Sequence, residues 1–417
     1  MLIHSASQLI CLRGGPQRGA HLGELDIIHD GAVYLQDDAI LQVGTSADLL
    51  QRFPDEARLD AQRQVVMPGF VDPHTHLIWA GDRANEFTQR LEGKSYMEIM
   101  AAGGGINATV QATRHASSAD LKKSTSSRAW SALRHGTTTL EAKSGYALDM
   151  PGEQRLLEIL MELGTELPLD ITPTYLGAHA VPPEFSGRTQ DYVDLLVEKV
   201  LPQLKTWWRQ RYTHQALPFV DVFCEPNVFN LQHTRVILST AKSLGYPLKI
   251  HADEFENIGG AALAAELGAV SADHLVKISA ADIRKLAPSA SVAVALPCTP
   301  FGLAESHYTP AREIIAGDGL LALASDLNPG TAWCGNMQFV IALACRYMKL
   351  TPAQALAAAT INAAAAINRQ DKIGSLEPGK QADLLILNVP DYRHLGYRFG
   401  ENLVQTVIKK GKVIDFS

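Results

Sequence analysis

The stretch Met67-Pro-Gly-Phe-Val-Asp-Pro-His-Thr-His76 says most about the fold of this chain. It ends an apolar run with two histidines, His74 and His76, that are separated by one residue. In an extended segment alternate side chains point to the same side, and neutral imidazole is the commonest ligand for zinc and its neighbours. Taken alone, the spacing suits two solvated turn residues slightly better. The hypothesis of a metal site therefore depends on the rest of the chain.

Further candidate ligands and acid-base groups follow later apolar runs in the same way. His251 ends one such run and has Glu254 three residues further on. Asp326 follows another, where a buried carboxylate would be costly unless it is paired or bound to a cation. His179 and His274 each end a similar run. The repeated position of these residues, at the ends of runs, favours a metal site.

Eight strand-like runs alternate with helical patterns or long loops. The runs are Val65 to Asp72, Gly136 to Glu141, Asp170 to Tyr175, Phe219 to Cys224, Pro247 to Ile250, Ala269 to Ala272, Ser291 to Leu296 and Leu320 to Ala324. Apolar residues recur at helical spacing in Glu153 to Leu163, Tyr192 to Leu204, Thr234 to Leu244 and Gly259 to Leu267. The alternation predicts an α/β fold, a (β/α)8 TIM-type barrel. Chemistry in such barrels sits at the carboxyl ends of the strands, where the candidate residues fall.

Both ends of the chain predict a second, smaller domain. Residues 1–63 hold short strands broken by turns, and Asp37-Asp38 suits a hairpin turn. The tail, 375–417, is also strand-like. Neither segment is long enough to bury a face alone, so we expect the two to pair into one composite β-sandwich domain. The barrel is then expected over residues 64–374.

Composition excludes several classes of protein. A length of 417 residues accommodates a barrel of typically about 250 residues and a smaller domain. A hydrophobic content of 46% with 19% charged residues indicates an ordinary globular enzyme rather than a disordered or fibrous chain. A net charge of -7 argues against a nucleic-acid partner, because phosphate recognition requires a basic surface.

The cysteines and the apolar runs bear on the compartment. Five scattered cysteines with no Cys-x-x-Cys pair indicate neither a disulfide framework nor a thiolate zinc site, so a reducing cytoplasm is expected. No stretch approaches the roughly 18 uncharged apolar residues of a membrane span, and no secretory signal is expected at the start of the chain. The alanine-rich run from Ala353 to Ile367 instead predicts a buried helix that breaks at Asn362.

The motifs together resemble the amidohydrolase superfamily, whose strand-end His-x-His, two later histidines and strand-eight Asp match His74, His76, His251, His274 and Asp326. Within it the chain is similar, over nearly its full length, to the imidazolonepropionase family. The similar segments are Phe70 to His76, Gly103 to Ile106, Glu141 to Tyr146, Gly177 to Pro183, His251 to Glu254 and Asp326 to Thr331. The resemblance implies hydrolysis of the ring amide of 4-imidazolone-5-propanoate to N-formimidoyl-L-glutamate in histidine degradation. It also implies one zinc or iron ion per subunit. We expect a homodimer that binds this small molecule and neither nucleic acid nor membrane.

The resemblance also assigns roles at the metal. It implies that the ion is held by His74, His76, His251 and Asp326. A bound divalent ion lowers the pKa of a water molecule from about 15.7 toward about 7. His274 would orient that water or steady the developing oxyanion, and Asp326 would accept its proton. Glu254 would face the ring and hydrogen-bond to its nitrogen or protonate it. Which of Asp326, His274 and Glu254 moves which proton stays open.

Substrate contacts carry over by position in the same way. Arg83 corresponds to the family's substrate-binding arginine, and a guanidinium suits bidentate pairing with a propionate carboxylate. Tyr146 and His179 would supply further polar contacts. The loop after Asp326 would line the substrate through Asn328, Gly330 and Thr331. Lys143 is interpreted as structural rather than as a carbamylated bridge, because the family's site holds one metal.

Two other functions remain open from the sequence. The nearer is a deaminase of a nitrogen heterocycle in the same superfamily, because His-x-x-Glu at the fifth strand also serves those enzymes. Release of ammonia would distinguish it. The other is a non-catalytic scaffold, although such relatives typically lose metal ligands and this chain has the whole set.

Overall fold

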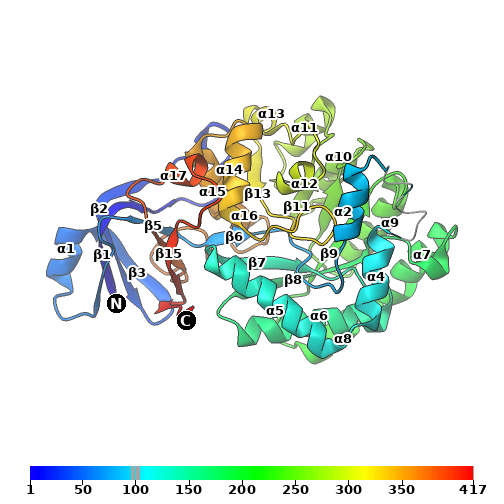
Figure 1. Cartoon of the computed structure of the whole chain (residues 1–417), viewed down its shortest axis with the longest axis horizontal. Helices are drawn as coiled ribbons and strands as arrows, with labels where there is room; N and C mark the ends of the chain where they lie inside the picture. Colours follow the sequence, from blue (N-terminus) through cyan, green and yellow to red (C-terminus); the bar gives the residue numbers. More distant parts are fainter. Residues whose placement is uncertain (95–97, 99–103, 417) are drawn as a thin grey trace.

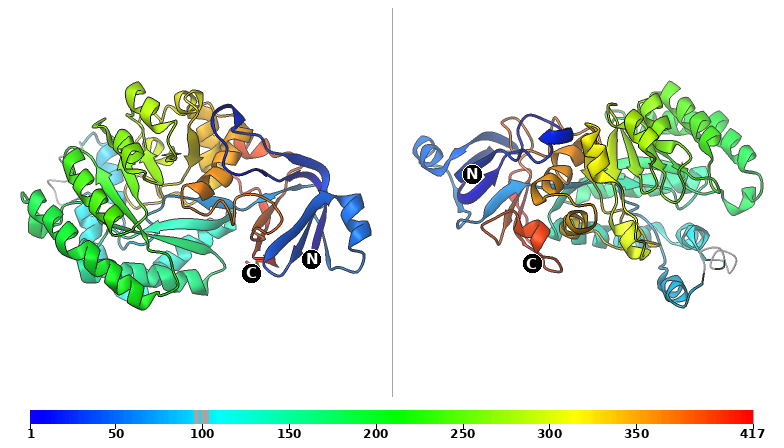
Figure 2. Two further views of the ribbon diagram at one scale, coloured as in Figure 1. Left: turned by 180° about the vertical axis from the view of Figure 1, so that it is seen from behind. Right: turned by 90° about the horizontal axis from the view of Figure 1, so that it is seen from above.

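A computed structural model describes residues 1–94, 98 and 104–416. Two units lie side by side: a parallel barrel surrounded by helices, and a smaller sheet domain that contains both termini (Figure 1). The view from above separates the same two units (Figure 2). The predicted fold class is confirmed. Within the described ranges no helix is long and apolar enough to cross a membrane.

The barrel consists of eight parallel strands in chain order. Each strand pairs in parallel with the next, so the carboxyl ends of all the strands lie at the same face of the barrel. The strands are β6 (Phe70–Asp72), β7 (Thr137–Lys143), β8 (Asp170–Ala178), β9 (Phe219–Cys224), β10 (Lys249–Ala252), β11 (Ser271–His274), β12 (Val292–Ala295) and β13 (Leu320–Leu323). Each predicted run overlaps one of these strands.

The first predicted run, Val65 to Asp72, is wrong as a single barrel strand. Its first half forms β5 (Val65–Pro68), which pairs with strands of the small sheet, and only β6 joins the barrel. Gly69 marks the junction. A Cβ atom there would lie 2.9 Å from Cβ of Thr138 and closer still to its methyl and hydroxyl groups. Close packing against β7 therefore requires glycine where the chain passes between the two domains.

The barrel closes through the segments that carry candidate ligands. Strands β6 and β13 lie at the two ends of the sheet order. Beyond them, the backbone N–H of Asp326 donates to the carbonyl of His74 at 3.1 Å, and that of His76 donates to the carbonyl of Leu327 at 2.9 Å. The buried carboxylate of Asp72 accepts the backbone N–H of Ser325 at 3.0 Å. The two ends are thus joined by backbone hydrogen bonds next to the site.

Helices cover the outside of the barrel and bury its apolar surface. Several are capped by a side chain, for example Asp149 before the helix that follows β7 and Asn230 before the one that follows β9. The main ones are α4 (Ile106–His115), α5 (Ser118–Arg134), α6 (Met150–Glu166), α7 (Thr189–Leu195), α8 (Leu201–Arg211), α9 (Leu231–Ser243), α10 (Gly260–Leu267), α11 (Ala280–Leu286), α12 (Cys298–Gly302), α13 (Ala311–Ala316) and α14 (Met337–Tyr347).

The alanine-rich run does not break at Asn362. It forms two helices, α15 (Pro352–Ala358) and α16 (Ile361–Ala365). The break lies before Asn362, at Thr360, whose backbone leaves the helical conformation with φ -130° and ψ -92°. Asn362 lies inside α16. Its amide donates to the carbonyls of Gln17 at 2.8 Å and Leu321 at 2.9 Å. Because these partners satisfy the amide, the polar residue is tolerated in a buried helix.

The small domain is one mixed sheet of eight strands from both ends of the chain. β5 lies at its centre, between strands contributed by the two termini. The domain boundaries at residues 63/64 and 374/375 stay a prediction. The remaining strands are β1 (Leu2–Ile10), β2 (Ile27–Gln36), β3 (Ala39–Thr45), β4 (Arg58–Asp60), β14 (Leu384–Leu387), β15 (Val404–Lys409) and β16 (Lys412–Val413), with α1 (Ser46–Arg52) and α17 (His394–Tyr397) beside them.

Candidate metal centre

Four of the predicted residues bring their ligand atoms together at the carboxyl face of the barrel. Nε2 of His76 lies 3.4 Å from Nε2 of His251 and 3.5 Å from Oδ1 of Asp326. Nε2 of His74 lies 3.5 Å from the same Asp326 oxygen. All four side chains are buried. The arrangement places three imidazoles and one carboxylate around a common point.

The residues fit a divalent ion. Ligand atoms bound at about 2.0–2.2 Å in a tetrahedron lie roughly 3.4 Å apart, which matches these separations. Nε2 of His74 and Oδ1 of Asp326 are buried and have no hydrogen-bond partner among the described residues. Leaving such atoms unsatisfied is costly, and a cation would satisfy both. His274 belongs to an overlapping group with His74 and His251, whose ligand atoms lie within 4.8 Å of one another.

Two buried aspartates orient the ligand imidazoles. Nδ1 of His74 donates to Asp273 at 2.6 Å, and Nδ1 of His251 lies 3.1 Å from Asp221. A carboxylate accepts hydrogen bonds only, so these contacts leave Nε2 of each ring free for a metal. The sequence analysis missed both aspartates. A signal was present for Asp221, which is an acid inside the otherwise apolar strand β9, but not for Asp273, which lies in the mostly polar strand β11.

Lys143 lies beneath the centre, in a buried ion network. Its Nζ donates to Glu141 at 2.7 Å and to Asp221 at 2.8 Å. Burial alone would lower the pKa of Lys143, but the charges of Asp221, Glu141 and Asp273 outweigh it and raise that pKa. An ammonium group held by two carboxylates is not available for carbamylation. This geometry supports the interpretation of Lys143 as structural.

Burial disfavours the protonated form of His74, His76 and His274. Burial lowers the pKa of His74 and His76 well below the ordinary value, and neighbouring positive groups act in the same direction. Burial also lowers the pKa of His274 to about 3. A neutral imidazole keeps the lone pair that a metal or a proton requires.

Glu254 lies beside the centre and faces His274. Its Oε2 is 3.6 Å from Nε2 of His274. Burial, reinforced by the negative charges of Asp326 and Glu225, raises the pKa of Glu254 well above its usual range. Glu225 also fixes the turn, because its carboxylate accepts the backbone N–H groups of residues 254–256 at 2.9–3.2 Å. Burial therefore favours the protonated form of Glu254, and the turn defines its position.

His179 and Tyr146 lie against the ring of His76. The ring of His179 stacks on that of His76, with centroids 4.8 Å apart and an interplanar angle of 18°. Nδ1 of His179 donates to the carbonyl of Gly145 at 3.0 Å. Tyr146 lies 5.1 Å from His179 between ring centroids, and burial raises the pKa of its hydroxyl. Both side chains thus lie next to the ligand histidines.

The loop after Asp326 is held by one side chain. Oδ1 of Asn328 accepts the backbone N–H groups of Gly330 at 2.7 Å and Thr331 at 2.8 Å, and its amide donates to the carbonyl of Asp326 at 2.7 Å. The Asn328 side chain is therefore engaged within the loop. In this loop Gly330 packs against Arg83. A Cβ atom at residue 330 would lie 2.9 Å from Cζ of Arg83 and closer still to its Nη1.

Two cavities border this arrangement. One, of about 380 Å3, is lined by Arg83, Gly330 and Thr331 among others. The other, of about 170 Å3, is lined by Glu254 and by Thr299, whose hydroxyl donates to the Asp326 carboxylate. Arg83 and Glu254 thus line two separate cavities. Within the predicted motif 103–106, Gly103 lies outside the described residues.

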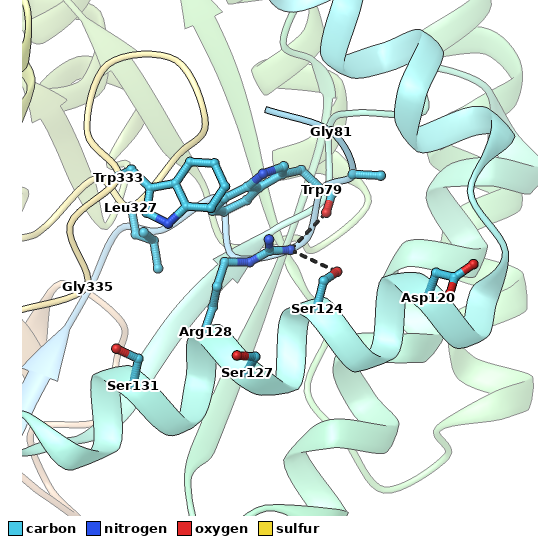
Figure 3. A pocket seen from close by; sticks show the side chains of 11 residues that line it. Trp79, Gly81, Asp120, Ser124, Ser127, Arg128, Ser131, Leu327, Trp333 and Gly335 are labelled. Atoms are coloured by element: carbon cyan, nitrogen blue, oxygen red, sulfur yellow. Dashed lines mark hydrogen bonds between the residues drawn. The ribbon is translucent and has the colours of Figure 1, made fainter. Parts of the chain in front are cut away.

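A larger cavity, of about 640 Å3, lies on the outer side, between α5 and the segments that follow His76 and Asp326. Figure 3 shows Arg128 beneath the indole of Trp79, with Trp333 next to it. The guanidinium lies 3.5 Å from the Trp79 ring and donates to the carbonyls of Leu77 at 2.9 Å and Trp79 at 2.8 Å. These contacts hold the segment after His76, and none of the predicted site residues lines this cavity.

The chain is similar to known proteins in sequence and in fold. The amidohydrolase family profile matches residues 240–414. The chain is 48% identical to an imidazolonepropionase of Herpetosiphon aurantiacus, over 99% of this chain and 96% of that protein. It is 46% identical to an imidazolonepropionase of Chloroflexus aggregans, over 99% and 98%. A zinc-bound adenosine deaminase structure from Xanthomonas campestris matches with a TM-score of 0.71 and 20% identity, over 99% of this chain and 92% of that one. At that identity the structural likeness shows a shared fold.

Proposed function

This chain belongs to the imidazolonepropionase family of amidohydrolases, and from that membership we propose that it hydrolyses the ring amide of 4-imidazolone-5-propanoate. Water adds to the ring carbonyl carbon, the C–N bond breaks, and the product is N-formimidoyl-L-glutamate. The observation that carries the proposal is the sequence identity of 48% to an imidazolonepropionase over nearly the whole chain. The geometry supports it, because the ligand atoms converge on one point and Glu254, whose pKa is raised by burial, lies beside His274.

The enzyme is metal-dependent, and we assign its ion to His74, His76, His251 and Asp326. Zinc or iron suits this set of imidazoles and a carboxylate, with one ion per subunit. When bound, such an ion supplies acidified water near neutral pH and polarises the carbonyl.

The side chains divide the proton transfers. Asp326 accepts the proton of the attacking water, and the neutral His274 orients that water. Glu254 carries a proton, because burial and nearby acids raise its pKa. It donates this proton to the ring nitrogen as the C–N bond breaks, so that the nitrogen leaves in neutral form as part of the formimidoyl group. The new carboxylate remains on the former carbonyl carbon.

The propionate arm selects the substrate. We assign its carboxylate to Arg83, with Tyr146 and His179 contacting the ring and the loop residues Asn328, Gly330 and Thr331 lining it. Arg83 packs against Gly330, where the missing side chain leaves room for the guanidinium. A charge-assisted pair there favours a substrate that carries a carboxylate over a neutral heterocycle.

Incubation with 4-imidazolone-5-propanoate tests the reaction. We expect loss of the ring, formation of N-formimidoyl-L-glutamate and no ammonia. Ammonia release from a heterocycle, with the imidazolone left intact, would favour the deaminase alternative. An inert protein without bound metal would favour a scaffold.

A metal variant tests the ligand assignment. Because one ion organises the whole reaction, His251→Ala should lose both the metal and the activity. The measurement is metal content by elemental analysis, together with turnover, of the purified variant and of wild type. Full turnover in a metal-free His251→Ala protein would exclude the assignment.

We also propose that the enzyme is a cytoplasmic homodimer. The five cysteines lie free, which agrees with a reducing compartment. Sedimentation of the purified protein measures the oligomeric state, and a monomer would contradict the dimer.

A further inference from the structure

Glu86, which the sequence analysis did not single out, is a buried acid next to the substrate arginine. It lies in the first turn of α2 (Ala84–Leu91), and 9% of its surface is exposed. Its Oε2 accepts a hydrogen bond from Nε of Arg83 at 2.8 Å. Both side chains of this pair are about 12% exposed, so little water competes with the contact.

The hydrogen bond between Glu86 and Nε of Arg83 determines which edge of the guanidinium points away from Glu86. An arginine presents its five N–H donors in a fixed planar fork. Because Glu86 holds Nε, the two terminal nitrogens remain on the other side, and Nη1 lies against Gly330. The two terminal nitrogens form one of the two edges from which a guanidinium can bind a carboxylate in bidentate fashion, and the other edge, which contains Nε, is occupied by Glu86.

The second carboxylate oxygen of Glu86 reaches a different segment. Oε1 accepts the backbone N–H of Gly105 at 2.9 Å. Gly105 directly precedes α4 and adopts φ 74 and ψ -158, a conformation that favours glycine. One carboxylate therefore joins the substrate arginine to the start of the next helix.

A buried carboxylate bound on both oxygens has little freedom to move. Arg90, one turn further along α2, donates from Nη2 to the carbonyl of Gly330 at 3.1 Å. The guanidinium of Arg83 thus contacts Glu86 on one side and Gly330 on the other, and Arg90 of α2 binds the loop that contains Gly330. A guanidinium placed in this way pays little entropy on binding a substrate.

We propose that Glu86 is a positioning residue that sets the direction of Arg83 toward the substrate carboxylate. It acts through Arg83 and touches neither the ligand atoms nor Glu254. The inference rests on the proposed function, because it takes the propionate arm as the partner of Arg83.

Steady-state kinetics with 4-imidazolone-5-propanoate tests the proposal in the metal-loaded enzyme. Glu86→Ala should raise KM on the order of 10- to 100-fold and change kcat less, because a displaced guanidinium weakens binding of the arm. The KM of Glu86→Gln should lie between those of wild type and Glu86→Ala, since the glutamine amide oxygen still accepts a hydrogen bond from Nε of Arg83. Glu92→Ala, an exposed acid at the end of the same helix, should behave as wild type.

A double variant separates positioning from general stability. If Glu86 acts only through Arg83, the KM of Arg83→Met/Glu86→Ala should equal that of Arg83→Met. Multiplied effects in the double variant, or an unchanged KM in both Glu86→Ala and Glu86→Gln, would overturn the proposal. If Glu86→Ala does not fold, the same comparison is made with Glu86→Gln, Arg83→Met and the double variant Arg83→Met/Glu86→Gln. Absence of turnover in wild type would count against the proposed function instead.

Discussion

Glu254 illustrates how a single residue takes its role from its surroundings. The sequence offers a glutamate three residues after a ligand, and burial beside Asp326 and Glu225 raises its pKa well above the usual range. Glu254→Gln should keep the metal, because the four assigned ligands are untouched. It should reduce turnover by about 10²–10⁴-fold, the usual loss when acid-base help is removed. Metal content and kcat of the variant check this, and loss of the metal would make Glu254 a ligand.

Arg83 is the residue to which we assign the choice of substrate. Arg83→Met should keep fold and metal but lose about 2–5 kcal/mol of productive binding, measured mainly in kcat/KM. Arg83→Lys should recover only part of this, because an ammonium keeps the charge and loses the planar fork. Circular dichroism and metal analysis serve as controls. Unchanged hydrolysis of 4-imidazolone-5-propanoate by Arg83→Met would remove Arg83 from the site.

At the scale of elements, the junction between β5 and β6 depends on Gly69. A Cβ atom there overlaps the side chain of Thr138 on β7, so Gly69→Ala should destabilise the protein by about 1–3 kcal/mol. Gly164→Ala is a matched control. It lies inside α6 with its nearest atom at 3.6 Å, and should be neutral or stabilise by up to about 1 kcal/mol. Denaturant midpoints of both variants test this, and equal midpoints would show that the junction relaxes.

At the scale of the whole molecule, Asp170 links the barrel to the small domain. It begins β8, and its carboxylate lies 3.2 Å from Lys409 of β15 and 3.0 Å from Arg369. Burial alone would raise the pKa of Asp170, but the charges of Lys409 and Arg369 outweigh it and hold that pKa well below its usual value. The pair therefore stabilises the fold above the unfolded pKa of about 3.9, and this contribution is lost as the pH falls toward the folded value.

The corresponding variant is Asp170→Asn. At pH 7 it should be less stable than wild type by about 3 kcal/mol, as for a broken buried ion pair, and the difference should shrink below about pH 4. Asp371→Asn, at an exposed acid nearby in the chain, should change little. Denaturant midpoints of all three proteins at pH 7 and at pH 3 provide the measurement. A difference that stays constant with pH would show that charge is not the cause.

Local patterns explain how much of the site was predictable. The period of apolar residues and the polar residues at the ends of runs are written in neighbouring positions, so the eight strands and the ligands His74, His251 and Asp326 could be proposed from sequence. Asp273 could not, because its partner His74 lies 199 residues away. Glu86 was equally invisible, since its meaning depends on where Gly105 comes to lie.

By itself, the sequence determined the alternation of strands and helices, the pairing of the two termini into a second domain, and the chemistry available at the strand ends. These follow from periodicity and residue type, which need no knowledge of distant contacts. Only the tertiary structure decided that the run before His74 divides at Gly69, that Asp221 and Asp273 contact the imidazoles, and that burial raises the pKa of Glu254. Each depends on burial and on neighbours brought close by closure of the barrel, and burial sets both the packing and the electrostatics.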